Sequence, residues 1–164
     1  MARPVSAAAA IETGGRTVPA DWIDYNGHMM DAYYSVAFTE ATEMLLDHVG
    51  LGAAYRARTG CGIYTVEGHI CFRASVRGGE QLRYTSRLLG CDSRRLHVFH
   101  QMLMTSGTEA ATNELMFLHV DLATEQVTAM AAEQLAAVSA LAAQHAMLPV
   151  PQAAGRSITL RRPG

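Results

Sequence analysis

Apolar residues recur with the spacing of an α-helix in one long segment that begins at Asp31 and ends near Val49. Within it they occupy positions i, i+3, i+4 and i+7, whereas polar residues such as Glu40 and Glu43 occupy the opposite side. The pattern predicts a long helix with one buried stripe. We expect Asp31 to cap its N-terminus, and Gly50, just beyond its end, to adopt the left-handed conformation of a C-terminal cap.

After Gly62 the apolar and polar residues alternate, as they do in β-strands. The pattern predicts strands over residues 63–73, 81–91, 96–105 and 111–121. The turns between them are short, and the first contains Gly78 and Gly79. We therefore expect consecutive antiparallel hairpins.

The remaining segments complete the expected order of elements. A first strand is predicted over residues 16–22, and an Ala-rich second helix over residues 131–147. Residues 1–15 show no periodicity and end in two glycines. They are expected to form a flexible N-terminal arm, followed by a single domain with its C-terminal helix and tail over residues 16–164.

This order of elements predicts an α+β protein in which an antiparallel sheet covers the long helix, because neither element can bury its apolar side alone. A sheet of this size has exposed edges, and proteins commonly cover such edges by pairing them across a two-fold axis. We therefore expect a homodimer or a dimer of dimers.

Composition narrows the classes of function. The chain has 164 residues, with 13 basic and 15 acidic side chains and a formal net charge of −2. Because the net charge is slightly negative, the chain has no excess of positive charge that would bind a polyanion. Nucleic acid is therefore not an expected partner. The apolar stretch near the N-terminus is too short for a secretory or membrane segment, so we expect a cytoplasmic protein with no membrane partner. The three cysteines, Cys61, Cys71 and Cys91, lack C-x-x-C spacing and are expected to be free thiols.

The segment directly before the long helix gathers a carboxylate, an amide and an imidazole, from Asp24, Asn26 and His28. A helix N-terminus has unpaired N–H groups and a partial positive charge, which together stabilise an oxyanion. A nearby carboxylate can attack a carbonyl or activate water beside it. The alternative is structural: Asn26 and Gly27 form a tight turn that Asp24 caps. From chemistry alone the two interpretations are equally supported.

The wider pattern resembles the hotdog-fold acyl-CoA thioesterases. It consists of W-x-D-x-x-G-H-M over residues 22–29, a helix with Glu40 and Glu43, and T-V-E-x-H over residues 65–69. Within that superfamily the chain is similar to the 4-hydroxybenzoyl-CoA thioesterase branch. The string D-Y-N-G-H-M from Asp24, together with L-H-x-F-H from Leu96, most resembles the betainyl-CoA thioesterases associated with carnitine dehydrogenase.

The resemblance implies an acyl-CoA thioesterase with coenzyme A as the leaving group and no metal or redox cofactor. It implies that Asp24 is the catalytic carboxylate, either as nucleophile or as general base on water. It also implies that a backbone N–H near Asp31 polarises the thioester carbonyl, and that strand residues of a partner subunit complete the site at the dimer interface.

The other residues around Asp24 have two interpretations each. His28 either orients Asp24 or a water molecule, or it caps and packs. Asn26 is a turn residue or touches the substrate. The aromatic side chains of Trp22, Tyr25 and Tyr33 are candidates for a cation–π cage around a trimethylammonium group, with core packing as the alternative.

Strict alternation on the strand over residues 63–73 places Thr65, Glu67 and His69 on one face. The apolar residues on the other face are Tyr64, Val66, Ile70 and Phe72. We expect the apolar face to cover the helix and the polar face to point either to solvent or to a second subunit, where Thr65 or Glu67 would complete a site. A metal site is not expected, because His97 and His100 lie three residues apart on a strand and point to opposite faces.

Two other functions remain open on the sequence. The pair Asp24-x-Asn26 also resembles hotdog enoyl-CoA hydratases, but their motif sets the His one residue farther from the Asp and has Pro where this chain has Gly27. The third possibility is a non-catalytic acyl-CoA-binding partner, because a fold alone does not establish catalysis.

Overall fold

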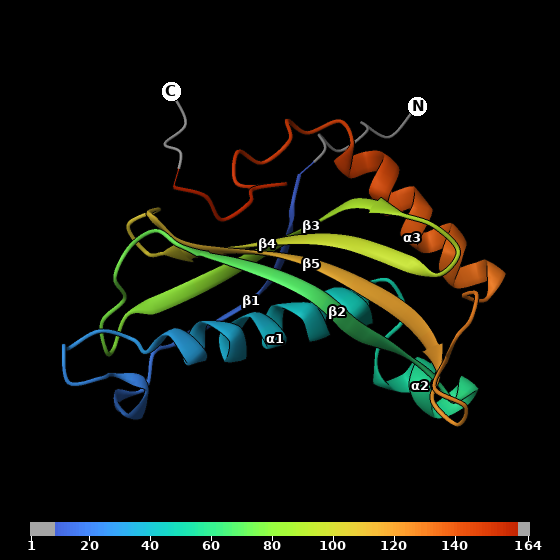
Figure 1. Cartoon of the computed structure of the whole chain (residues 1–164), viewed down its shortest axis with the longest axis horizontal. Coiled ribbons are helices and arrows are strands. Elements are labelled where there is room, and N and C mark those ends of the chain that lie inside the picture. The colour runs from blue at the N-terminus through green and yellow to red at the C-terminus, as the bar shows by residue number, and fades with distance from the viewer. Residues whose placement is uncertain (1–8, 161–164) are drawn as a thin grey trace, which may run out of the picture.

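The computed structural model describes residues 9–160 as a curved antiparallel sheet whose concave face holds one long helix (Figure 1). The strands are β1 (Ile11–Thr17), β2 (Cys61–Phe72), β3 (Gln81–Cys91), β4 (Arg95–Met104), β5 (Glu109–Asp121) and β6 (Gln126–Val127). The helices are α1 (Asp31–His48), α2 (Ala53–Thr59) and α3 (Ala132–His145), with a 3-10 turn, η1, at Ala20–Trp22. The expected α+β class and the sheet wrapped around α1 are confirmed.

The strand order is β1-β3-β4-β5-β2, and β6 pairs with the end of β5. The expected hairpins β3–β4 and β4–β5 are confirmed, but the hairpin expected between β2 and β3 is wrong, because β2 pairs with β5. The turn at Gly78 and Gly79 closes on the end of β1 instead. The N–H of Gly79 donates to the carbonyl of Val18 at 2.9 Å, and the N–H of Val18 donates to the carbonyl of Glu80 at 2.9 Å. β1 and β2 are therefore the two edges of the sheet.

The long helix α1 carries the predicted apolar stripe. Its buried residues are Tyr34, Ala37, Phe38, Ala41 and Leu45. Asp31 is the first helical residue and not the cap, because its Oδ1 accepts the N–H of the adjacent Ala32 at 2.8 Å while Met30 takes the extended cap position. The expected ending is confirmed: Gly50 has a φ of 74°, and the N–H of Leu51 donates to the carbonyl of Leu46 at 2.8 Å.

The first strand lies earlier than the sequence predicts. β1 covers Ile11–Thr17 and pairs with β3, whereas residues 20–22 form η1, so the strand expected over 16–22 is wrong in its bounds. The two glycines suggested a loose arm, but they lie at a β-bulge in β1. A Cβ on Gly15 would lie 2.2 Å from the carbonyl oxygen of Leu82, so this close approach requires glycine. Residues 1–8 of the expected arm lie outside the described residues.

The convex face of the sheet is covered by α3 and the segment that follows it (Figure 1). The second helix expected over residues 131–147 is thereby confirmed. The buried guanidinium of Arg87, on β3, donates to the carbonyl of Pro149 at 2.8 Å and to those of His145 and Leu148 at 3.4 Å. Within residues 9–160, no helix is long and apolar enough to cross a membrane.

Candidate active site

The loop between η1 and α1 is a small closed turn built around Asp24. The N–H of Asp24 donates to the carbonyl of His28 at 2.9 Å, and the N–H of Gly27 donates back to the carbonyl of Asp24 at 3.0 Å. Gly27 has a φ of 80°, a conformation that glycine adopts without strain. The sequence Asn26-Gly27 therefore makes the tight turn that was expected.

The same turn fixes the carboxylate of Asp24. Its Oδ1 accepts the backbone N–H groups of Asn26 at 2.8 Å and of His28 at 3.3 Å, and its Oδ2 accepts the side-chain amide of Asn26 at 3.3 Å. Desolvation raises the pKa of Asp24, but these hydrogen bonds to the charged form outweigh it, so the pKa lies below its ordinary value. The carboxylate is ionised at neutral pH and held in one orientation.

The core of the protein anchors both ends of this loop. Trp22 and Met29 are buried. The N–H of Met29 donates to the carbonyl of Val76 at 2.8 Å, and the N–H of Met30 donates to the carbonyl of Trp22 at 2.9 Å. Val76, which is buried on the crossover between β2 and β3, thus ties the loop to the sheet. Asp24 is presented by a rigid turn at the start of α1.

An open pocket lies at the N-terminus of α1. It is lined by His28, Met29, Asp31, Tyr34, Phe72, Arg73, Ala74 and Ser75. Asp24 is not among these residues, but its carboxylate binds the backbone of His28. In the part of the chain that the structure describes, the N–H of Asp31 donates to no acceptor. This end of the helix is therefore suited to receive a polarised carbonyl oxygen.

The end of β2 contributes residues that sequence reasoning missed. Phe72 packs edge to face against Tyr34, with ring centroids 5.0 Å apart, and Arg73 lines the same pocket while pairing with Glu109 at 3.2 Å. The sequence placed Phe72 on the face that covers the helix, but it gave no sign that Phe72 or Arg73 would reach the site, because the return of β2 to the start of α1 is a property of the strand order.

The three aromatic side chains proposed as a cage take different positions. Trp22 is only 7% exposed, stacks on Tyr33 at 4.8 Å between centroids, and has the guanidinium of Arg16 over its ring at 4.1 Å. Its ring is thus occupied by residues of the same chain, as the packing alternative expected. Tyr25, at the tip of the loop, is 98% exposed. Tyr25 and Tyr33 stay candidates for substrate contact.

A β-bulge in β2 overturns the strict alternation expected for this strand. The register shifts between Thr65, opposite Phe117, and Glu67, opposite Met116, so that Val66 is the additional residue. Thr65 therefore faces α1 together with Gly68 and Ile70, whereas Glu67 and His69 face away. The prediction that Thr65 and Glu67 share a face is wrong.

The bulge also changes the apolar residues of β2. Ile70 and Phe72 lie on the side of α1, as expected. Tyr64 and Val66 were expected there too, but they are 44% and 53% exposed. The strand therefore leaves apolar side chains in solvent along the free edge of the sheet.

The two histidines of β4 point to opposite faces, as predicted. Nε2 of His97 lies 2.7 Å from Oε1 of Glu114 on the outer face, whereas His100 is fully buried on the side of α1. Among residues 9–160, no group of three or more His, Cys, Asp or Glu side chains is placed to hold a metal ion.

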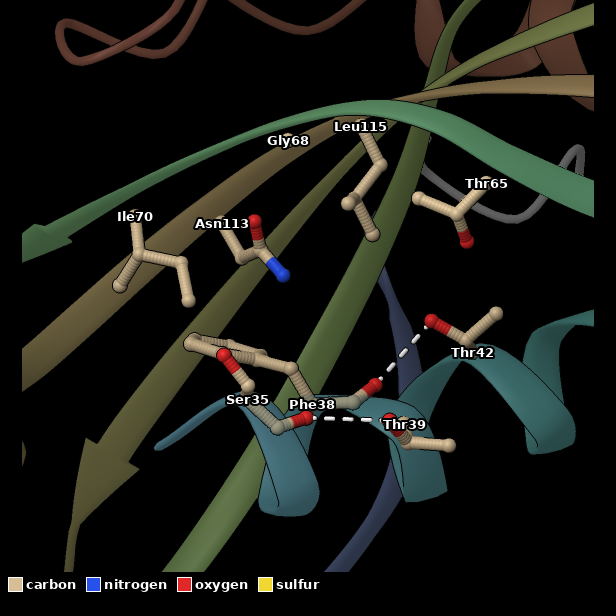
Figure 2. Close-up of a pocket in the computed structure, with 9 residues that line it drawn as sticks. All are labelled: Ser35, Phe38, Thr39, Thr42, Thr65, Gly68, Ile70, Asn113 and Leu115. Carbon is tan, nitrogen blue, oxygen red and sulfur yellow. Dashed lines mark hydrogen bonds between the residues drawn. The ribbon is translucent and has the colours of Figure 1, made fainter. Parts of the chain in front are cut away.

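A second cavity, of about 330 Å³, lies farther along α1, between the helix and β2 (Figure 2). Its lining residues are Ser35, Phe38, Thr39, Thr42, Thr65, Gly68, Ile70, Asn113 and Leu115. Ser35 and Ile70 adjoin Tyr34 and the end of β2, which line the first pocket. The two cavities thus follow one another along the cleft between helix and edge strand.

This fold and this loop define a known class of protein. The model of the thioesterase-like superfamily matches residues 18–138, and the chain belongs to that superfamily. It is a thioester hydrolase with the hotdog fold, and the resemblance stated from the sequence motifs is confirmed.

Individual relatives refine the comparison. The betainyl-CoA thioesterase of Pseudomonas aeruginosa is 40% identical over 141 residues, which cover 85% of this chain and 89% of that protein. The L-carnitine dehydrogenase/betainyl-CoA thioesterase of Agrobacterium fabrum is 43% identical over 141 residues, but these cover only 29% of that longer protein. A solved Staphylococcus aureus protein, in complex with CoA, superposes with a TM-score of 0.85 at 24% identity, covering 93% of this chain and 97% of that one, and shows the same fold.

Proposed function

We propose that the protein hydrolyses betainyl-CoA, or a closely related small acyl-CoA, to the free acid and coenzyme A. The observation that carries this proposal is the ionised carboxylate of Asp24, fixed by backbone N–H groups in the loop that leads into α1. The acyl group is inferred from the relatives named betainyl-CoA thioesterase.

In the proposed reaction the thioester carbonyl oxygen lies at the N-terminus of α1, near the N–H of Asp31, where the helix dipole stabilises the oxyanion. Asp24 acts in one of two ways. As a general base it takes a proton from water while the water oxygen bonds to the carbonyl carbon. As a nucleophile its own oxygen forms that bond, and water then hydrolyses the mixed anhydride. In both, the C–S bond breaks and the thiolate of coenzyme A leaves.

The remaining site residues have supporting roles in this proposal. Asn26 orients the carboxylate through its side-chain amide, which lies 3.3 Å from Oδ2 of Asp24. His28 lines the pocket beside Asp31 and is placed to hold a water molecule or the substrate. Tyr25 and Tyr33 contact the substrate from the loop and the first turn of α1. We propose no metal or redox cofactor for this reaction.

We further propose that the protein acts as a homodimer, alone or as a dimer of dimers, in the reducing environment of the cytoplasm. β2 is a 12-residue edge strand that pairs only with β5 among the described elements. Its exposed Tyr64, Val66 and Phe72 are an unusual surface for a strand facing water. Pairing of two β2 strands would bring Thr65 or Glu67 of one subunit to the other subunit's site.

The proposal is tested by replacing Asp24 with Asn, which keeps the shape of the side chain and removes its charge. Release of coenzyme A from betainyl-CoA is followed by thiol titration. We expect kcat to fall by about 10²- to 10⁴-fold, because the base or nucleophile is lost. The matched control, Asp21→Asn, alters an exposed carboxylate on η1 and should keep full activity.

Two results would count against the proposal. Full activity in Asp24→Asn would remove this residue from the reaction. A folded wild-type protein that releases no thiol from betainyl, aliphatic or aromatic acyl-CoAs would end the hydrolase proposal and make enoyl-CoA hydration, then simple binding, the next activities to measure.

A further inference from the structure

The cavity between α1 and β2 has no role in the reaction so far, yet it begins within reach of the thioester. Its first residue on the helix, Ser35, follows Asp31 by four positions, which is about 6 Å along the axis. Its last, Thr42, lies about 16 Å from Asp31 by the same measure. A short acyl group whose carbonyl rests at the start of α1 would enter this cavity first.

Two hydroxyl groups on the helix side of the cavity, those of Thr39 and Thr42, already donate their protons to backbone carbonyls. Thr39 donates to the carbonyl of Ser35 at 3.0 Å, and Thr42 donates to the carbonyl of Phe38 at 3.1 Å (Figure 2). The hydroxyl oxygens therefore offer lone pairs to whatever fills the cavity. None of the lining residues carries a charge. The helix side therefore presents lone pairs from Thr39 and Thr42 and no charge.

A buried chain of hydrogen bonds fixes the orientation of Thr42. The hydroxyl oxygens of Thr13 and Ser86 are 2.6 Å apart, Ser86 lies 2.6 Å from Nδ1 of His100, and Nε2 of His100 lies 3.0 Å from Oγ1 of Thr42. Because Thr42 gives its own proton to Phe38, Nε2 of His100 is the donor and Nδ1 accepts from Ser86. His100 is a positioning residue, because it acts on the cavity only through Thr42.

Asn113 adds an unpartnered polar group to the same cavity. It is 5% exposed, it pairs across strands with His100, and its side chain projects from β5 toward α1 (Figure 2). Its Oδ1 is buried and has no hydrogen-bond partner among the described residues. A buried amide oxygen without a partner is costly and typically marks a place that a ligand completes. A half-turn of the amide would direct this oxygen into the cavity.

We propose that this cavity is the acyl subsite and that Thr39, Thr42 and Asn113 select a quaternary ammonium acyl group. A trimethylammonium group carries positive charge on its methyl groups and has no N–H to donate and no lone pair to accept. It therefore suits the oxygen lone pairs of Thr39 and Thr42 beside the Phe38 ring. The inference rests on the proposed function and deepens it by naming the residues that recognise the acyl group.

The test compares two substrates of the same shape. Betainyl-CoA and 3,3-dimethylbutanoyl-CoA differ only in a nitrogen cation replaced by carbon. We expect the wild type to prefer betainyl-CoA in kcat/KM, and Thr42→Val and Asn113→Leu each to lower that preference about tenfold, the size of a lost contact to a charged group. The control, Thr105→Val, removes an exposed hydroxyl outside the cavity and should keep the preference.

Because Thr42 and Asn113 are packed against the core, an exposed variant provides a second measurement. Ser35→Leu blocks the entrance of the cavity and should raise KM for betainyl-CoA while sparing acetyl-CoA, whereas Val36→Leu, on the neighbouring exposed face, should change neither. An active enzyme whose preference survives in Thr42→Val, Asn113→Leu and Ser35→Leu would overturn the subsite alone. A wild type inactive on both substrates would overturn the proposed function first.

Discussion

Among single residues, His100 makes the stability of the folded protein depend on pH. It is fully buried between Ser86 and Thr42, and this burial lowers its pKa to about 3. The folded protein therefore keeps the ring neutral, whereas the unfolded chain binds a proton below about pH 6.5. Acid shifts the equilibrium toward the unfolded chain, so the stability that neutral His100 allows is lost as pH falls below 6.5.

We therefore expect the free energy of unfolding to decrease between pH 6.5 and 4.5, with His100 contributing up to about 1.4 kcal/mol per pH unit. Burial also lowers the pKa of His145, so this residue adds to the slope. His100→Gln should be less stable at neutral pH but should lose part of the slope, measured by urea unfolding at each pH. The control His48→Gln lies in solvent. An unchanged slope in His100→Gln would contradict the argument.

The sequence predicted the site residues of the Asp24 loop better than it predicted those of the cavity between α1 and β2. Asp24, Asn26 and Gly27 are contiguous, so local turn chemistry predicts both their geometry and their candidate chemistry. Ser86, His100 and Asn113 lie on three different strands, and a polar residue within a strand pattern normally indicates a solvated face. Only the strand pairing and the position of α1 bring them together beside Thr42.

At the scale of elements, Arg87 holds the segment after α3 against the sheet. Its buried guanidinium serves three carbonyl groups at or beyond the end of that helix. Arg87→Met should lower the free energy of unfolding by about 2–3 kcal/mol, because hydrogen bonds from a charged donor are lost inside the protein. Limited proteolysis should then cut within residues 146–160.

The matched control for this prediction is Arg83→Met on the same strand. Arg83 pairs with Glu12, but both side chains are more than half exposed, and such surface pairs contribute little. Equal losses of stability in Arg83→Met and Arg87→Met would show that the three carbonyl contacts do not hold the segment.

The bulge in β2 shows where element-scale prediction from sequence fails. The bounds of β2 were predicted within two residues. A single additional residue, Val66, nevertheless reverses the alternation, so that residues before it point to the opposite face from the one that strict alternation predicts. Alternation correctly placed Ile70 and Phe72 beside α1 and incorrectly placed Tyr64 there. Nothing in the residue types near Val66 indicates the bulge. It is set by pairing with β5, which is a long-range contact.

At the scale of the whole molecule, the free edge of β2 predicts association. Val66→Lys places a charge on this edge and should convert the proposed dimer to a monomer at micromolar concentration, as measured by light scattering. Thioesterase activity should fall with it, because the partner's strand completes the site. Val127→Lys, a substitution at a similarly exposed valine on β6, is the control and should remain dimeric. A wild type that is monomeric at all concentrations would contradict the proposed assembly.

Helix and strand periodicity predicted the class of fold. They did not predict which strand pairs with β2, because this pairing is between residues far apart in the sequence. The connection from Phe72 to Gln81 was expected to be a hairpin turn because it contains Gly78 and Gly79. The segment instead crosses the sheet from the edge strand β2 to β3. Val76, within this segment, is buried beneath the loop of Asp24. The segment thus belongs to the architecture of the site as much as to that of the sheet.

The position of β2 has one more consequence. The strand that forms a wall of the acyl cavity is also the strand left without a neighbour on one side. In the proposed dimer, dilution would therefore loosen the cavity as it separates the subunits, and turnover per chain would depend on how much enzyme is present. The concentration of the protein would then act as a regulator of its own specific activity, with no effector and no second binding site.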